Sequence, residues 1–317
     1  MNYTVAIDMG GTVTKTGLLC NGKLCDFTRM ESHSSKGLEY NLPRLKESID
    51  SLLSKYSIVT SQLNGIGIAF PGLSDPIIGR VLSTNDKYTG ATTFDLNGWV
   101  TQNWGVPFYI DNDARMAAAG EWQAGAGKGK ENMVMVTLGT GIGTGIVIDG
   151  HILYGKHFQA GVLGGHFVLD YKGRDCNCGN KGCIESMAAS CFLTAIITEH
   201  PDLSAAFKAR VAQLDFKTIF AMAAEGDADA LLLRNECMDI WSAAIVTYIH
   251  AYDPEVIVMG GGVMKSADVI IPYIKAKADR LAWCPMEKVP IVVAELGDNA
   301  ALYGLDYCLK QKRKRAC

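Results

Sequence analysis

One pattern occurs twice in this sequence and limits the folds that the chain can adopt. AIDMGGTVTKTGLLCNGKLCDF starts at residue 6 and VTLGTGIGTGIVIDGHILYG at residue 136, and each predicts a strand, a glycine-rich turn and further strands. Two copies indicate a duplicated α/β fold with a cleft between two similar domains. We expect a smaller domain at residues 1–119, completed by a closing helix at about 299–317, and a larger domain at 120–298.

The composition fits a folded protein of about two domains. The chain has 317 residues, of which 48% are hydrophobic, so it can bury a sizeable core. Its 30 Lys and Arg nearly balance its 33 Asp and Glu, which argues against a protein that mainly holds nucleic acid or an anionic membrane. No apolar run approaches the roughly 18 residues of a membrane span, and the start MNYTVAIDMGGT lacks the pattern of a signal peptide. We therefore expect a soluble cytoplasmic protein.

Both glycine-rich turns are candidate phosphate-binding sites. Glycine lets the backbone approach a phosphate closely, and a threonine adds a hydroxyl donor. The candidate residues are Asp8, Gly10, Gly11 and Thr12 in the first turn and Gly139, Thr140 and Gly141 in the second. Asp8, at the end of a predicted strand, could hold a hydrated Mg²⁺. The alternative for the first turn is an ordinary tight hairpin.

The glycine-rich turns do not follow the common nucleotide-binding motifs. The second turn cannot accommodate G-x-G-x-x-G, and Gly127-Lys128 lacks the remainder of a Walker A motif. The pair of turns is instead similar to the arrangement of the actin-like ATPase (ribonuclease H-like) fold, in which the ATP phosphates lie between two glycine hairpins. That similarity implies ATP and Mg²⁺ as cofactors, and it implies that a third turn with Gly261 and Gly262 contacts adenosine.

Asp111-Asn112-Asp113 lies where a strand is predicted to end and a helix to begin. An alcohol such as a sugar hydroxyl is a poor nucleophile, and a carboxylate within reach can orient it and accept its proton. Asn112 offers a donor and an acceptor to a neighbouring hydroxyl. The alternative is a helix N-cap, which Asn and Asp both favour and which does not exclude catalysis. We select Asp113 as the general base because we expect it to lie between the two phosphate turns.

A third cluster has the spacing of a metal site, H-x9-C-x-C-x4-C. Its members are His166, Cys176, Cys178 and Cys183. Three thiolates and an imidazole suit tetrahedral Zn²⁺ and leave no open position, which predicts a structural zinc site on a loop. The alternative is a set of buried residues with free thiols.

Residues 73–100 are expected to be irregular. Long irregular stretches inside a domain often carry function.

From residue 3 to about residue 308, the sequence resembles the ROK family, named for repressors, open reading frames and sugar kinases. The segments that carry this resemblance include GIAFPGLSDPIIGRVLSTN, IDNDARMAAAGEWQAGAG, GGHFVLDYKGRDCNCGNKGCIES and DPEVIVMGGGV. The zinc segment is most similar to that of glucokinases and N-acetylmannosamine kinases. The resemblance implies a homodimeric or homotetrameric kinase that uses ATP and Mg²⁺ to phosphorylate a hexose or N-acetylhexosamine, commonly at O6.

The resemblance also implies roles for single residues. Asp113 matches the family's base, and Lys15 lies in its first phosphate turn. The residues that match its sugar site are Gly72, Asn85, Asn112, His166 and Glu185, of which His166 is also a zinc ligand. One position departs from the pattern: Leu163 replaces a glutamate three residues before the histidine, and it cannot accept a hydrogen bond. The identity of the sugar therefore stays open, with Gln159 or His157 as candidate replacements for the missing acceptor.

Two other functions are alternatives. A sugar-responsive regulator of the same family would carry a helix-turn-helix ahead of the first strand, and we expect no room for one because that strand starts by residue 3. A sugar-binding pseudokinase is suggested by Leu163 alone. We expect a sugar substrate as partner, and neither nucleic acid nor a membrane.

Overall fold

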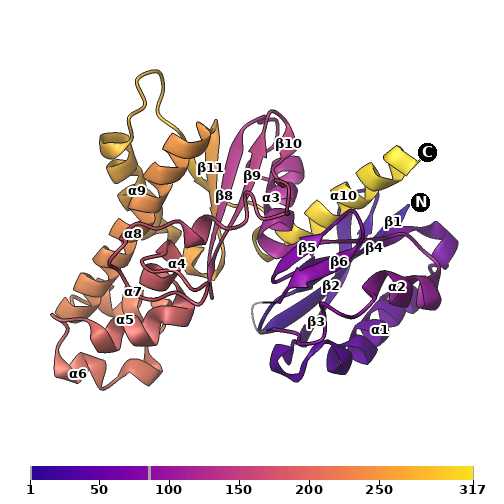
Figure 1. Ribbon diagram of the computed structural model, residues 1–317, viewed down its shortest axis with the longest axis horizontal. Helices are drawn as coiled ribbons and strands as arrows, with labels where there is room; N and C mark the ends of the chain where they lie inside the picture. Colours follow the sequence, from indigo (N-terminus) through magenta and orange to yellow (C-terminus); the bar gives the residue numbers. More distant parts are fainter. Residues whose placement is uncertain (1, 85–86, 317) are drawn as a thin grey trace. The chain divides into compact units, whose positions relative to one another are not determined.

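The computed structural model describes residues 2–84 and 87–316, the last three of them by their backbone alone. The chain divides into two compact units. Unit 1 comprises Met1–Gly129, Ile152–Gly161 and Asp298–Cys317, and unit 2 comprises Lys130–His151 and Val162–Gly297. In Figure 1 the indigo N-terminal strands and the yellow C-terminal helix both belong to unit 1, although they come from opposite ends of the chain.

Unit 1 contains a five-stranded sheet in the order β3-β2-β1-β4-β7. Its strands are β1 (Tyr3–Met9), β2 (Val13–Cys20), β3 (Lys23–Glu31), β4 (Leu63–Phe70) and β7 (Phe108–Asn112). Strand β1 pairs antiparallel with β2 and parallel with β4, and β4 pairs parallel with β7. The carboxyl ends of β1, β4 and β7 therefore meet at one edge of the sheet, where the first glycine turn leaves β1.

Unit 2 repeats this topology. Its five-stranded sheet has the order β10-β9-β8-β11-β12. The strands are β8 (Met133–Leu138), β9 (Ile142–Ile148), β10 (His151–Ile152), β11 (Val256–Gly260) and β12 (Ile291–Val293). Strand β8 pairs antiparallel with β9 and parallel with β11, as β1 does with β2 and β4. The duplicated α/β pattern predicted from the sequence is thus confirmed.

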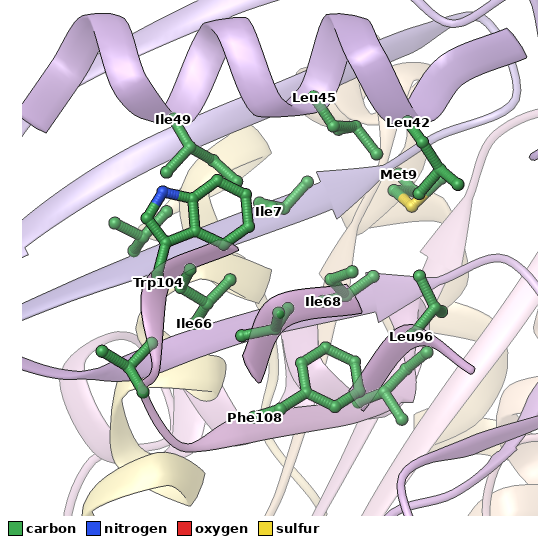
Figure 2. Close-up of a cluster of buried hydrophobic side chains, with 14 of the residues drawn as sticks. Ile7, Met9, Leu42, Leu45, Ile49, Ile66, Ile68, Leu96, Trp104 and Phe108 are labelled. Atoms are coloured by element: carbon green, nitrogen blue, oxygen red, sulfur yellow. The ribbon is translucent and has the colours of Figure 1, made fainter. Parts of the chain in front are cut away.

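One face of the unit 1 sheet carries the larger hydrophobic core. Val5, Ile7 and Met9 alternate along β1 and pack on this face with side chains of α1 (Leu38–Lys55) and α2 (Leu96–Trp104). Figure 2 shows part of this cluster, including Ile7, Ile68, Leu45, Ile49 and Trp104. Each fully buried Leu or Ile contributes about 1.5–3 kcal/mol relative to an exposed one. The side chains of Val5, Ile7 and Met9 therefore belong to this core.

The opposite face of the same sheet is covered by α3 (Asp113–Ala124) and α10 (Ala300–Ala316). Ala6 of β1 packs on this side. The two helices approach closely at Gly120, where a Cβ would lie only 1.9 Å from the carbonyl oxygen of Ala300. A side chain larger than hydrogen at this position would force the helices apart.

The α-helices of unit 2 lie between its strands along the chain. They are α4 (Ile184–Ala188), α5 (Leu193–Glu199), α6 (Ala205–Lys208), α7 (Phe216–Ala224), α8 (Ala228–Tyr252) and α9 (Ala267–Leu281). Trp241 of α8 is buried, and its indole donates a hydrogen bond to the carbonyl of Ala188 at 3.1 Å. This bond connects the long helix α8 to the short helix that follows the cysteine cluster.

The prediction of an irregular stretch at residues 73–100 is wrong at both of its ends. β5 (Leu73–Asp75) and β6 (Arg80–Ser83) form an antiparallel hairpin, and α2 begins at Leu96. The side chain of Asp95 caps α2 by accepting a hydrogen bond from the amide of Gly98 at 2.9 Å. In the described ranges, 2–84 and 87–316, every helix is too short or too polar to span a bilayer.

Candidate functional site

Asp8 and Asp113 lie at the same edge of unit 1. Asp8 is on the same face of β1 as Ala6, the face that α3 covers, because side chains alternate along a strand. Asp113 is the first residue of α3 and follows β7 directly. The strand register places Asp8 beside Ala69 of β4, and Ala69 beside Asp111 of β7. The two carboxylates are close enough for their charges to interact.

Both carboxyl groups are weaker acids than an ordinary aspartate. Burial and then the negative charge of Asp113 raise the pKa of Asp8 from 3.8 to about 7, against the opposing charge of Lys15. Burial also raises the pKa of Asp113, while the amide of Ala114 and the charge of Lys87 act to lower it. A carboxyl group with a raised pKa is better suited to accept a proton near neutral pH.

Asn112 positions the Asp113 carboxylate. Its Nδ2 donates to Oδ1 of Asp113 at 3.0 Å and to the carbonyl of Gly72 at 3.1 Å. Its own Oδ1 accepts from the amide of Arg115 at 3.0 Å, so the helix cap considered as an alternative is present, on Asn112. The amide of Ala114 donates a second hydrogen bond to Oδ1 of Asp113, at 2.8 Å. One carboxylate oxygen is thus held by two donors.

The neighbouring Asp111 has a different environment. It is fully buried, and its Oδ1 lies 2.6 Å from Nη1 of Arg115. The hydroxyl of Tyr109 donates to its other oxygen at 3.0 Å, and the amide of Asn112 donates to Oδ1 at 2.7 Å. A buried anion that is neutralised and fully hydrogen-bonded is a structural group. Of the two carboxylates, Asp113 is the more accessible one.

The carbonyl groups of the first glycine turn are fixed by hydroxyl groups. Ser32 and Tyr88 both donate to the carbonyl of Gly10, at 2.7 and 2.8 Å. Ser34 donates to the carbonyl of Gly11 at 2.8 Å. These bonds determine the orientation of successive peptide groups, which a turn that binds phosphate through its amides requires.

Lys15 connects this turn to the start of α10. The residue is buried, and its Nζ donates to the carbonyl of Asp298 at 2.5 Å and to Oδ1 of Asn299 at 3.0 Å. Burial lowers the pKa of the ammonium group, and the nearby charge of Arg29 lowers it further. Two hydrogen-bond donors of the Lys15 ammonium group are therefore already used within the protein.

Lys87 lies against the first glycine turn, although its sequence context did not predict a role for it. Its Cε and Nζ are 3.1 and 3.3 Å from the position that a Cβ on Gly11 would occupy. Its charge also acts on Asp113. The only sequence signal for this lysine was its place in a long connection inside a domain, where functional residues are common.

The second glycine turn lies in unit 2 beside Glu185. Oε2 of Glu185 accepts a hydrogen bond from the amide of Ile142 at 2.8 Å. A Cβ on Gly141 would lie 2.4 Å from the same oxygen, so a larger residue there would displace the Glu185 carboxylate from this hydrogen bond. The carbonyl of Thr140 accepts from the amide of Cys191 at 2.9 Å. Helix α4 and the segment after it thus support this turn from one side.

The third glycine turn packs against the second. Gly261 has a φ of 93°, a left-handed conformation that favours glycine, and a Cβ there would lie 2.3 Å from the carbonyl oxygen of Leu138. Leu138 is the last residue of β8, directly before Gly139. Gly262 begins a short 3-10 helix after β11. Two of the three predicted nucleotide turns are therefore adjacent within unit 2.

The four predicted metal ligands converge. One donor atom from each of His166, Cys176, Cys178 and Cys183 lies within 4.8 Å of all the others. The sulfurs of Cys178 and Cys183 are 3.6 Å apart, as are the sulfur of Cys176 and Nδ1 of His166. Zn–S bonds of about 2.3 Å in a tetrahedron place neighbouring sulfurs about 3.8 Å apart. The donor set and its spacing fit a zinc ion.

The predicted site residues divide between the two units. Unit 1 holds Asp8, Gly10, Gly11, Thr12, Lys15, Gly72, Asn112 and Asp113. Unit 2 holds Gly139, Thr140, Gly141, His166, Cys176, Cys178, Cys183, Glu185, Gly261 and Gly262. Asn85 lies outside the described residues. Leu163 is half-buried and directly precedes the 3-10 helix Gly164–His166.

Comparison with known proteins finds relatives over the whole chain. The model of the ROK family matches residues 4–312. A glucokinase of Halalkalibacterium halodurans is 32% identical over 98% of this chain and 96% of its own length. An N-acetylmannosamine kinase of Yersinia pestis is 30% identical over 96% of this chain and 97% of its own length.

The solved structures agree in fold. The crystal structure of a ROK hexokinase from Thermus thermophilus superposes with a TM-score of 0.79 and 26% identity, over 99% of each chain. The predicted fold class is thereby confirmed as α/β of the actin-like ATPase type, with one five-stranded sheet in each unit.

Proposed function

The chain belongs to the ROK family, and on this basis we propose that it is an ATP-dependent sugar kinase. The similar proteins named above are a glucokinase, an N-acetylmannosamine kinase and a hexokinase. In the proposed reaction a sugar hydroxyl oxygen bonds to the γ-phosphorus of ATP, and the bond from that phosphorus to the β–γ bridging oxygen breaks. ADP leaves, and the hydroxyl proton passes to Asp113.

The environment of Asp113 is the observation that carries this proposal. Two donors, from Asn112 and Ala114, both hold its Oδ1, which leaves Oδ2 as the less constrained oxygen. Its pKa is raised by burial, which favours proton acceptance. General base catalysis by a positioned carboxylate contributes about 10²–10⁴-fold to a rate. We therefore assign Oδ2 of Asp113 as the atom that takes the proton.

We assign the phosphates of ATP to the first and second glycine turns, and adenosine to the turn with Gly261 and Gly262. Asp8 stands at the end of β1 beside the first turn, and its carboxylate is the kind of ligand that Mg²⁺ takes together with water. A Mg²⁺ ion there would offset the charge of the transferred group. Because the pKa of Asp8 is about 7 in the free protein, cation binding at neutral pH would displace a proton from it.

The cysteine cluster is proposed as a structural zinc site. Cys183 directly precedes α4, and Glu185 is the second residue of that helix. A zinc ion held by His166 and three cysteines would therefore fix the start of the helix that supports the second glycine turn. All four tetrahedral positions are filled by protein ligands, which leaves no position for catalysis at the metal.

For the substrate we propose a hexose or an N-acetylhexosamine, phosphorylated at O6. Gly72, Asn85, Asn112, His166 and Glu185 stay the candidate sugar contacts. Leu163 lacks the acceptor that the family pattern has there, and one lost hydrogen bond shifts discrimination between sugars by about 1–3 kcal/mol. We therefore expect the C1–C2 end of the sugar to be recognised differently in this protein. A homodimer or homotetramer remains a prediction.

The test is ATP-coupled ADP release with glucose, mannose, N-acetylglucosamine and N-acetylmannosamine, followed by phosphorus NMR of the product. We expect turnover with at least one sugar and phosphate on O6. Tight sugar binding without turnover on any of them would favour the pseudokinase alternative. Salt-sensitive, sequence-selective DNA binding would favour the regulator.

A further inference from the structure

At the first glycine turn, a bound phosphate would be repelled by nearby carboxylate groups. The negative charges of Asp113 and Asp298 both raise the pKa of Asp8, so three carboxyl groups lie near one another at this edge of unit 1. A nucleotide phosphate at the turn would add negative charge beside these carboxyl groups. Like charges disfavour one another strongly where solvent is partly excluded. A side-chain cation that contacts the phosphate would compensate this charge in addition to the proposed Mg²⁺ ion.

The two cations nearest the Asp298 side are already engaged. Lys15 is buried and donates to two acceptors, at 2.5 and 3.0 Å, at the start of α10. Arg29 forms an ion pair with Asp298 at 3.7 Å and lies over the ring of Phe27. Neither side chain can turn toward the glycine turn without giving up these contacts.

Lys87 is a further cation close to the turn. Its Nζ is 3.3 Å from the point where a Cβ on Gly11 would lie, and its charge acts on Asp113. In the part of the chain that the structure describes, no acceptor or ion-pair partner is assigned to this ammonium group. The lysine therefore lies against the phosphate turn and close enough to the proposed base for its charge to act on it.

The backbone holds Lys87 in this place. Its own amide donates to the carbonyl of Thr84 at 2.9 Å. The next residue, Tyr88, is fully buried; its amide donates to the carbonyl of Ser34, and its hydroxyl donates to the carbonyl of Gly10. The residue that fixes the turn and the lysine that covers it are thus adjacent in the chain. These hydrogen bonds of Lys87 and Tyr88 fix the position of the lysine backbone relative to the turn.

We propose that Lys87 is a catalytic residue that contacts the γ-phosphoryl group of ATP at the first glycine turn and compensates its charge during transfer. This proposal rests on the proposed kinase function. The compact ammonium group, with three donors, is well suited to phosphate oxygens. Placed next to Asp113, it would also attract the phosphoryl group toward the hydroxyl that this base activates.

The test compares Lys87→Met with Lys87→Arg and with a matched control, Lys23→Met. Lys23 is exposed at the start of β3, at the end of the sheet far from the turn. ATP and ADP affinities are measured by calorimetry with Mg²⁺ and without sugar. Because ADP lacks the γ-phosphate, a loss of ATP affinity alone reports a contact with that group and not with the remainder of the nucleotide. For Lys87→Met we expect ATP affinity to fall about tenfold and ADP affinity by less than twofold. The control should change neither affinity.

The kinetic arm uses the best sugar of the substrate panel. Lys87→Met should lower kcat about 10²-fold with the KM for sugar within twofold, and Lys87→Arg should recover part of the loss. Equal loss of ATP and ADP affinity, or a raised sugar KM with kcat retained, would overturn the proposal. If the wild-type protein turns over no sugar, the kinase function fails, while the ATP-to-ADP comparison still decides the role of Lys87. Lys87→Gln replaces Lys87→Met if the latter does not fold by circular dichroism.

Discussion

Asn112 donates a hydrogen bond from Nδ2 to Oδ1 of Asp113 over 3.0 Å. The same side chain caps α3 through the amide of Arg115 and holds the carbonyl of Gly72. One residue therefore begins the helix and orients the proposed base. Stability and catalysis should consequently be separable by substitutions that preserve one task and remove the other.

Asn112→Ser should separate the two tasks. Serine is a good N-cap, so the cap is kept and the free energy of unfolding should fall by only about 1 kcal/mol, for the lost bond to the carbonyl of Gly72. The donor to Asp113 is lost, and kcat should fall about tenfold or more because a charge-assisted hydrogen bond is removed. Asn112→Ala should lose the same activity and about 1 kcal/mol more stability than Asn112→Ser, because the cap is lost too. Denaturant unfolding and steady-state kinetics on both variants check this; an Asn112→Ser protein with full kcat would show that the bond does not position the base.

Arg115→Met should destabilise unit 1 strongly. The substitution leaves Asp111 buried without its ion-pair partner, and breaking a buried pair costs about 3–5 kcal/mol. Arg80→Met, at an exposed position, is the matched control and should cost less than about 0.5 kcal/mol. Chemical denaturation of the two variants makes the comparison. A similar small loss in both would mean that the buried pair contributes nothing to folding.

Asp8 should make stability depend on pH. Its pKa rises from 3.8 to about 7 on folding, so between these values the folded state binds more protons than the unfolded state. The free energy of unfolding that this group contributes therefore falls as pH rises from about 4 to about 7. Without Mg²⁺, Asp8→Asn should be more stable than the wild type at pH 8 and equal to it near pH 4. Asp202→Asn, at an exposed position, is the control, and its free energy of unfolding should match that of the wild type at both pH values. If the stability of Asp8→Asn changed with pH in parallel with the wild type, the raised pKa of Asp8 would be refuted.

The cysteine cluster should hold one zinc ion per chain. Elemental analysis should find it in the wild type and in Cys25→Ser, an exposed cysteine of unit 1, but not in Cys178→Ser. Chelation should lower the Tm by at least about 5 °C, and added Zn²⁺ should restore it, since a metal that binds the folded state stabilises it. Equal metal content in the two variants would contradict the ligand assignment.

The repeated strands could be predicted because local sequence determines them. In β1 the side chains alternate between two covered faces, and the glycines after Met9 allow an immediate return in β2. The start of α2 was missed because its capping residue, Asp95, ends a polar connection without apolar periodicity of its own. The β5–β6 hairpin was missed for a related reason, since one of its strands has only three residues.

The site could be predicted only where its residues follow one another in sequence. Asp113 and the metal ligands stand in short motifs whose chemistry is visible in the residues themselves. Lys87 has no such motif, because its relation to Gly11 arises from tertiary contacts through Tyr88. The task of Asp111 was also hidden, because its pairing with Arg115 depends on burial, which the motif does not reveal.

The most direct test of the central claim is the kcat of Asp113→Asn with ATP and the best sugar. We predict a fall of about 10²–10⁴-fold, with ATP affinity and the free energy of unfolding close to those of the wild type, because only the proton acceptor is removed. A variant that folds, binds ATP and keeps the wild-type kcat would contradict the assignment of Asp113 as the general base.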